Sequence, residues 1–539
     1  MYNKELAKKR YLVIDDFSEM RSMMQGMLRV FGVEAIETAR DGKEAIEKLE
    51  RGSFDVVLCD YNLGQGKDGQ QVLEEARHRN LVGIGTIFVM ITAENTREMV
   101  MGAMEYAPDS YLSKPFTKDV LEARLIKLVA KKADLAAVQK AVQEGKVDQA
   151  IKLLDERIRQ KPRNIAELSR YKAELCMDAK KYDRAAAVYE QALAVREVPW
   201  ALMGMGQVHY ARGEYDQAKE IFQNLIDENE GLISAYDWLA KIHKAQGDLE
   251  AAQEVLTKAI DISPKAVLRQ KALGEIALSN NDLETAEKAF DKAVSVGKFS
   301  VFKHPETYAK LACTKSKRDG NNDALKVIKQ MEHEFGNDKE AQLFTHSSKS
   351  TIFTNMGDEE SAKESLKEAE ALFDRIGTQL DSSAALEMAR ACADSGDKQR
   401  SLEIMQDMIR NNHDSDELLQ DVEAAYKTLG IGGDVKDAIH GVRKEIIKLN
   451  NKGVSLTQEG KLEEAIALFE KAADGMRGNR VINLNAAKVL ILHMQKNGAN
   501  TEHLGKTRKY LDVVRKLEPD NPRLKQLQQA FVKIAESGD

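Results

Sequence analysis

Three residue types are scarce in this chain of 539 residues. It has 8 prolines, which interrupt helices, 4 cysteines, which can cross-link loops, and 2 tryptophans. The cysteines lie far apart, at Cys59, Cys176, Cys313 and Cys392, and form neither a CxxC pair nor another metal-ligand spacing. This distribution argues against a disulfide framework. It predicts buried, reduced thiols in a cytoplasmic protein.

Long apolar runs are also missing. No stretch approaches the roughly 20 apolar residues that a membrane-spanning helix needs, so no membrane insertion is expected. The N-terminus is basic, but only a short apolar stretch separates it from Asp15 and Asp16. That length predicts a first β-strand and excludes the apolar core of a signal peptide.

An excess of positive charge is absent as well. The formal net charge of −7 provides no basic footprint for nucleic acid or for an anionic membrane. With 43% hydrophobic and 31% charged residues, the chain is expected to fold and to contain long solvated helices. Its length corresponds to about three to four domains.

The first feature that is present is an alternation of strands and helices over residues 11–132, organised around Asp60. The predicted strands are Tyr11–Asp15, Val33–Thr38, Phe54–Asp60, Ile84–Thr92 and Ser110–Ser113. The predicted helices are Ser18–Phe31, Lys43–Arg51, Gln70–Arg79, Thr96–Ala103 and Thr117–Ala130. Five strands, each followed by a helix, are typical of a parallel sheet covered on both faces.

Polar residues stand at the carboxyl ends of four of these strands, where open α/β sheets bind ligands. We therefore expect Asp15, Asp16, Asp60, Thr92 and Lys114 to share one pocket. Three carboxylates in one place repel each other, so Mg²⁺ is the natural occupant. A carboxylate beside Mg²⁺ and a lysine can attack a phosphoryl group, and Lys114 and Thr92 can then stabilise the added oxygens.

The pattern Asp15-Asp16, Asp60, Thr92-Ala93 and Lys114-Pro115 resembles the receiver domain of bacterial response regulators over residues 9–132. The resemblance implies a flavodoxin-like, doubly wound fold in which Asp60 is the phosphoacceptor. It also implies roles for the other residues, with Mg²⁺ held by Asp15, Asp16, Asp60 and the backbone carbonyl of Asn62, a switch pair of Thr92 and Tyr111, and dephosphorylation tuned by Asn62 and Glu94. One departure is Gly64, where the family usually has proline, and the loop to Gly69 is about one residue longer.

After residue 132 the strand signals vanish and a turn followed by alanine recurs. The clearest copies end at Ala150, Ala185, Ala218, Ala252, Ala286 and Ala465. The first five are separated by steps of about 34 residues, the period of the tetratricopeptide repeat. A large residue follows four positions after most of these alanines, as at Phe222 and Leu256.

These segments resemble tetratricopeptide repeats, which implies an α-α superhelical solenoid. The expected organisation is a receiver at 1–132 and a solenoid at 133–539 of about ten or eleven helical hairpins, irregular at 402–450. An extra hairpin, Ser415–Leu429 with Asp434–Leu449, would fill the irregular part, and Gly430–Gly433 is the expected bend. Residues 117–144 contain neither glycine nor proline, so we expect a stiff junction between the two parts.

The repeats hold no catalytic constellation, so the chain is not expected to be an enzyme. Family register places a mixed aromatic and basic set on the concave face, suited to an extended or helical peptide of acidic character. That set is Arg170, Trp200, Met203, Tyr210, Asp237, Lys241, Lys244 and Lys271.

The predicted function is a two-component response regulator. A histidine kinase, or a small acyl phosphate donor, would phosphorylate Asp60, and the receiver would then alter the binding of protein clients by the repeats. The first alternative is a constitutive scaffold whose receiver localises it or drains phosphate. An aspartyl phosphatase would want a second Asp where Asn62 stands, and DNA binding would need a basic recognition helix. Receiver dimerisation, the client and the direction of the switch stay open.

Overall fold

The computed structural model describes residues 4–93, 108–132, 135–377, 380–430, 435–519 and 521–537. Two compact units make up the chain, Met1–Lys303 and His304–Asp539. Each unit is described by itself below. Within the described residues, no helix is long and apolar enough to cross a membrane.

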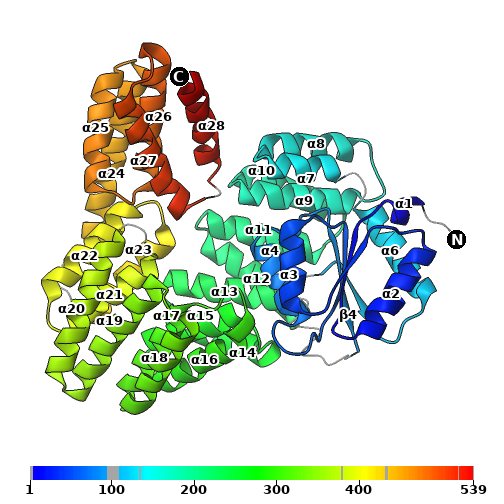
Figure 1. Ribbon diagram of the computed structural model, residues 1–539, viewed down its shortest axis with the longest axis horizontal. Helices are drawn as coiled ribbons and strands as arrows, with labels where there is room; N and C mark the ends of the chain where they lie inside the picture. Colours follow the sequence, from blue (N-terminus) through cyan, green and yellow to red (C-terminus); the bar gives the residue numbers. More distant parts are fainter. Residues whose placement is uncertain are drawn as a thin grey trace. The chain divides into compact units, whose positions relative to one another are not determined.

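The first unit begins with a five-stranded sheet, ordered β2-β1-β3-β4-β5 (Figure 1). Its strands are β1 (Tyr11–Ile14), β2 (Ile36–Ala39), β3 (Val56–Asp60), β4 (Ile87–Thr92) and β5 (Ser110–Ser113). All neighbouring pairs are parallel. The predicted doubly wound parallel sheet is therefore confirmed.

Helices cover both faces of this sheet, α2 and α6 on one face and α3 and α4 on the other (Figure 1). Their bounds are α2 (Ser18–Val30), α3 (Gly42–Arg51), α4 (Gly69–His78) and α6 (Lys118–Lys131), with a short α1 (Lys4–Ala7) before β1. The strands are buried on both sides because alternate residues join opposite cores. Val57 packs with the α3 and α4 residues, whereas its neighbours Val56 and Leu58 pack with those of α2 and α6.

The start of β2 differs from the prediction, because Val33 takes part in the turn that follows α2. Its backbone N–H donates to the carbonyl of Leu28, and Gly32 before it has a φ of 89°. The chain needs these residues to turn out of α2, so pairing with β1 begins only at Ile36. The predicted helix Thr96–Ala103 lies outside the described residues.

The rest of the first unit consists of antiparallel helical hairpins. Their helices are α7 (Ala136–Gln143), α8 (Val147–Arg159), α9 (Ile165–Asp178), α10 (Tyr182–Val195), α11 (Pro199–Ala211), α12 (Tyr215–Glu228), α13 (Ile233–Gln246), α14 (Leu249–Ile262), α15 (Val267–Ser279) and α16 (Leu283–Val296), followed by the 3-10 turn η1 (Gly297–Phe299). The recurring alanines are the fully buried contacts of these hairpins, as at Ala218 and Ala252. Small side chains there let two helices approach closely.

A glycine and a ring sixteen residues apart close several hairpins. The ring of Phe222 lies on Gly206, so close that a Cβ on this residue would come within 2.6 Å of the ring. Gly274 with Phe290 and, in the second unit, Gly453 with Phe469 repeat the arrangement. In these repeats the large residue of the second helix therefore packs on a glycine of the first helix.

The second unit continues with helical hairpins. Its helices are α17 (Pro305–Lys317), α18 (Asn321–Phe335), α19 (Lys339–Met356), α20 (Glu359–Ile376), α21 (Ser382–Asp394), α22 (Lys398–Asn411), α23 (Asp416–Leu429), α24 (Val435–Gln458), α25 (Leu462–Gly475), α26 (Arg480–Asn497), α27 (Thr501–Leu517) and α28 (Pro522–Ser537). The expected extra hairpin at 415–449 takes another form. α24 has 24 residues and runs on through Leu449 to the turn at Gly460, so it also serves as the first helix of the next hairpin.

The junction after the sheet is made by two separate helices. α6 ends at Lys131 and α7 begins at Ala136, with residues 133–134 outside the described part. Contacts near the junction hold the two sides together, since Lys131 Nζ lies 3.0 Å from Glu167 Oε1 and Asn164 Nδ2 donates to the Lys131 carbonyl at 3.0 Å. The stiffness expected of a stretch without glycine or proline stays a prediction.

Candidate functional site

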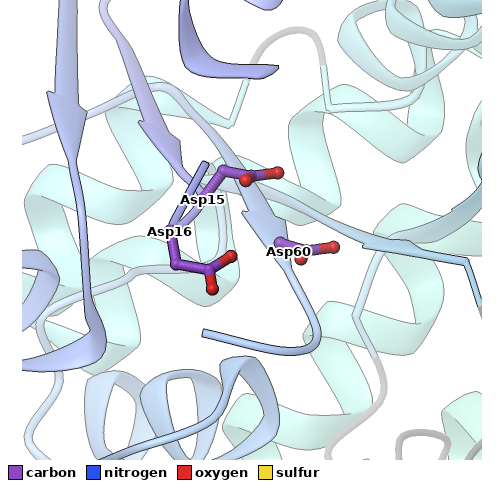
Figure 2. A group of neighbouring side chains, drawn as sticks. All are labelled: Asp15, Asp16 and Asp60. Atoms are coloured by element: carbon purple, nitrogen blue, oxygen red, sulfur yellow. The ribbon is translucent and has the colours of Figure 1, made fainter. Parts of the chain in front are cut away.

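Three carboxylates lie together at the carboxyl ends of β1 and β3 (Figure 2). Asp15 and Asp16 follow directly after β1, and Asp60 is the last residue of β3. One oxygen of each lies within 4.8 Å of the others. The three carboxylates that the strand ends predict to lie close together do so in the structure.

Lys114 reaches this group from the residue after β5. Its Nζ lies 2.9 Å from Asp15 Oδ2 and 3.0 Å from Asp60 Oδ1. Pairing between β4 and β5 sets its position, because the Lys114 backbone N–H donates to the Thr92 carbonyl at 2.7 Å. The lysine thus forms ion pairs with two buried carboxylates at once.

Burial controls the protonation of the site. It raises the pKa of Asp60 to about 6, a rise that the hydrogen bond and charge of Lys114 oppose and that Asp15 and Asp16 reinforce. Burial lowers the pKa of Lys114, but its hydrogen bonds to Asp15 and Asp60 outweigh this effect and hold the pKa above its ordinary value. The lysine therefore stays charged, whereas burial disfavours the charged form of Asp60.

This donor set fits a hard divalent cation. Asp16 Oδ1 is buried and has no hydrogen-bond partner within the described part of the chain, and Lys114 neutralises only part of the charge of three carboxylates. Carboxylate oxygens with backbone carbonyls and water are the ligands that Mg²⁺ takes. Asp15, Asp16 and Asp60 are the residues that would hold it.

The loop after Asp60 is shaped by two glycines. Gly64 has a φ of 71°, and a Cβ there would lie 3.2 Å from Asp16 Oδ2. Proline cannot adopt that angle, so the chain takes a different course here from one with proline at this position. Gly69 packs directly on the Asp60 carbonyl oxygen, where a Cβ would come within 2.1 Å.

A comparison with known families decides what this domain is. Residues 11–126 match the family described as "Response regulator receiver domain". The chemotaxis protein CheY-3 of Vibrio cholerae is 34% identical over 125 residues, which are 22% of this chain and 90% of that protein. The chain belongs to the response regulator receiver family.

Other comparisons cover the receiver again and extend to the helical part. The receiver is similar to CheY of Pseudomonas aeruginosa, which is 32% identical over 119 residues, 22% of this chain and 94% of that protein. The solved structure of Vibrio cholerae CheY4 aligns at 28% identity with a TM-score of 0.21, covering 22% of this chain and 97% of that one. Tetratricopeptide repeat families match residues 135–199, 177–242, 233–265 and 449–474, so the receiver is fused to tetratricopeptide repeats (TPRs).

The remaining receiver residues of the prediction lie as follows. Thr92 ends β4 and pairs with Ser113, and Tyr111 pairs with Met90 in the register of β4 and β5. The Tyr111 hydroxyl is buried without a hydrogen-bond partner within the described ranges. Asn62 is exposed, and its side-chain oxygen accepts from the Gly64 N–H at 3.3 Å. Glu94 lies outside the described residues.

The two aromatic residues and the methionine predicted to line the groove of the repeats take part in packing. Trp200 packs partly buried beside Tyr189, with their ring centroids 5.9 Å apart. Met203 and Tyr210 pack against the core of α12 and α13, and Tyr210 lies 5.3 Å from Trp238. All three side chains are half-buried.

The charged residues of that set differ from one another. Arg170 is exposed and pairs with Glu174, and Lys241 is exposed with its ammonium 4.7 Å from the Trp238 ring centroid. Lys244 and Lys271 are half-buried, whereas Asp237 is held by Arg269, whose Nε lies 2.7 Å from it. The predicted set did not include Trp238, whose ring lies under the ammonium of Lys241. An aromatic residue directly after Asp237 could have suggested it.

Sequence reasoning also missed Arg21 as a support of the site. Its Nη1 donates to the backbone carbonyls of Asp15 at 2.7 Å and Asp16 at 3.1 Å. These bonds fix the turn after β1, and the Phe17 N–H donates to Asp15 Oδ1 at 2.9 Å. An arginine one turn into the following helix gives little signal in a single sequence, because exposed arginines are common there.

Proposed function

We propose that this protein is a phosphorylation-dependent response regulator in which Asp60 accepts a phosphoryl group and the repeats bind a protein client. The observation that carries the proposal is the bridge of Lys114 between Asp15 and Asp60, at the strand ends of a domain of the receiver family. An isolated strand-end carboxylate does not need such a bridge. A carboxylate that must exchange its single negative charge for a doubly charged phosphoryl group does.

The reaction would begin with an oxygen of the Asp60 carboxylate attacking the phosphorus of a phosphohistidine or an acyl phosphate. The new P–O bond forms as the P–N or P–O bond to the donor breaks, and the donor's leaving group keeps the electron pair. Lys114 would hold Asp60 ionised before the attack and then pair with the phosphoryl oxygens. Bound Mg²⁺ supplies further neutralisation of charge, and Thr92 would donate to a phosphoryl oxygen.

A histidine kinase or a small acyl phosphate is the donor that fits this chemistry, and a cytoplasmic setting fits both donors. The repeats would act by binding rather than by turnover of a substrate. Lys241 stacked on Trp238 offers a cation over an aromatic face, which suits a client segment with acidic and apolar side chains. Phosphorylation would change which clients the repeats retain.

Retention of clients with and without beryllofluoride tests this proposal against the constitutive scaffold. The full-length protein and Asp60→Asn would be immobilised with Mg²⁺, and bound proteins identified by mass spectrometry. We expect the wild-type set to change on addition of beryllofluoride and the Asp60→Asn set to stay constant. An unchanged wild-type set would favour the scaffold.

A further inference from the structure

Helix α4, which follows the phosphoacceptor loop, packs against the repeats at residues 296–302. Gln71 Nε2 donates to the Val296 carbonyl at 3.3 Å. The Ser300 hydroxyl donates to Glu74 Oε2 at 2.5 Å, and both residues are buried, at 6% and 5% exposure. A buried carboxylate is tolerated where a donor satisfies it, so this bond fixes the two surfaces together.

Two further contacts extend the same interface. Lys67 Nζ, just before α4, donates to the Phe299 carbonyl at 2.6 Å. At the other end of the helix, the His78 ring meets the Phe302 ring edge-on, with centroids 5.1 Å apart. Residues 296–302 are thus held along the whole length of α4.

The contacts come from one stripe of the helix. Gln71, Glu74 and His78 are spaced by three and four residues, which places them on one face. The opposite face, with Val72 and Ala76, packs on the sheet. α4 is therefore packed between the receiver sheet and the repeats.

The start of α4 is tied directly to the phosphoacceptor. The Gly69 N–H donates to the carbonyl of Tyr61 at 2.7 Å, and Gly69 packs on the Asp60 carbonyl. The Tyr61 hydroxyl donates to Gln70 Oε1 at 3.2 Å inside the core. A movement of residues 60–61 is therefore transmitted to the first turn of α4.

Gln71 joins both connections in one side chain. Its Oε1 accepts from the Asp68 N–H at 3.2 Å, closing the capping box at the end of the phosphoacceptor loop. Its Nε2 is the group that reaches Val296. A change in the loop that reorients this amide loses the contact with the repeats.

We propose that residues 296–302 form a docking site for the receiver's own α4, occupied while Asp60 is unmodified and released when Asp60 carries a phosphoryl group. The released segment then becomes accessible to the client of the repeats. This inference rests on the proposed function, because it assigns that function its regulatory surface. In the structure, α4 occupies this site.

The direction of the switch follows from the bonds at both ends of α4. In the unmodified receiver, Lys114 is shared by Asp15 and Asp60 while α4 is docked. A phosphoryl group recruits Lys114 and the loop after Asp60 to its own oxygens. The Glu74–Ser300 pair tolerates little displacement, because a small separation of two buried polar groups loses the hydrogen bond between them.

Charge interactions of Arg77 are consistent with the same coupling. Arg77 of α4, exposed at the surface, lies within electrostatic range of Tyr111 on one side and of Tyr171 and Glu174 in α9 on the other. Burial raises the pKa of Tyr111 and the charge of Arg77 opposes that rise.

Hydrogen exchange of the full-length protein tests the proposal. Backbone exchange at residues 296–302 would be followed by mass spectrometry in Mg²⁺, with and without beryllofluoride, while ¹⁹F NMR reports bound beryllofluoride. We expect exchange in this segment to rise by about fivefold or more when the ligand is bound, in line with ordinary coupling energies. Asp60→Asn should show no rise.

Variants of the interface test the reverse effect, of docking on ligand binding. Ser300→Ala and Gln71→Ala should raise exchange at 296–302 without ligand and lower the beryllofluoride concentration needed for half-saturation by the same factor. Ser295→Ala is the matched control, because its hydroxyl bonds to Lys292 within α16. It should behave as the wild type.

The outcomes separate the two proposals. Bound beryllofluoride with unchanged exchange at 296–302 would overturn the docking site and leave the proposed function standing. Absence of a bound ¹⁹F signal would contradict the proposed function itself, and the docking site with it.

Discussion

The ammonium of Lys114 lies 3.0 Å from Oδ1 of Asp60, and the two side chains are only 14% and 8% exposed. The same ammonium contacts Asp15. Without it, two buried carboxylates would face each other uncompensated. The charge balance of the site therefore depends on one lysine until a cation binds.

Lys114→Met should destabilise the receiver by about 1–3 kcal/mol in Mg²⁺-free buffer, because it leaves buried carboxylates without their partner. Added Mg²⁺ should restore more stability to this variant than to the wild type. Urea unfolding with and without Mg²⁺ measures both effects. Lys118→Met, an exposed lysine of α6, is the control and should change little. Equal stability of Lys114→Met and the wild type would contradict the bridge.

Asp60→Asn should stabilise the metal-free protein in a pH-dependent way. The folded pKa of Asp60, about 6, lies above its ordinary value of 3.8. The protonated form is thus favoured on folding, and the stability this brings is complete below about pH 4 and lost as the pH rises through 6. At pH 8 the Asn variant should therefore be more stable by about 1–2 kcal/mol. Thermal unfolding at pH 4.5 and pH 8 checks the sign, and a gain confined to pH 4.5 would refute it.

Gly69→Ala should disrupt the site, because its Cβ would lie 2.1 Å from the Asp60 carbonyl oxygen, an atom of the backbone that cannot yield. We expect a loss of about 3 kcal/mol and weaker Mg²⁺ binding. Gly26→Ala is the matched control, since open space surrounds its Cβ position inside α2. That substitution should stabilise the helix by up to about 1 kcal/mol. Similar unfolding midpoints for the two variants would contradict the packing.

Gly206→Ala should destabilise the repeats by about 1–3 kcal/mol, because the new Cβ meets the Phe222 ring at 2.6 Å. The next repeat has Ala240 and Leu256 at the corresponding positions, where both are buried. The double variant Gly206→Ala with Phe222→Leu should therefore recover much of the loss. Denaturant unfolding of the single and double variants measures this coupling. Strictly additive losses would show that the pair does not pack as a unit.

The receiver site could be predicted from sequence because its determinants are local. Asp15, Asp60 and Lys114 each follow a short apolar strand, and a parallel sheet brings such strand ends to one edge. Thr92 and Tyr111 take their places from the same strand pattern. The loop geometry around Gly64 needed the structure, since glycine permits many backbone angles.

The contacts of α4 with the repeats could not be predicted. Gln71 and Val296 are 225 positions apart, and Glu74 and Ser300 are 226 apart. A polar stripe on a helix is ordinarily a solvated face, so one sequence gives no sign that Glu74 is buried. The length of α24, in contrast, could have been predicted. Gly453 stands sixteen residues before Phe469, as Gly206 does before Phe222. That spacing marks a repeat helix and was available in the sequence.

Direct mapping of phosphate tests the central claim that Asp60 takes up a phosphoryl group. The full-length protein would be incubated with acetyl phosphate and Mg²⁺, and its intact mass and the peptide containing Asp60 measured before and after acid treatment. The account predicts one acid-labile phosphoryl group on Asp60, dependent on Mg²⁺ and absent from Asp60→Asn. Undiminished acid-labile phosphate on Asp60→Asn, or none on the wild type, would contradict it.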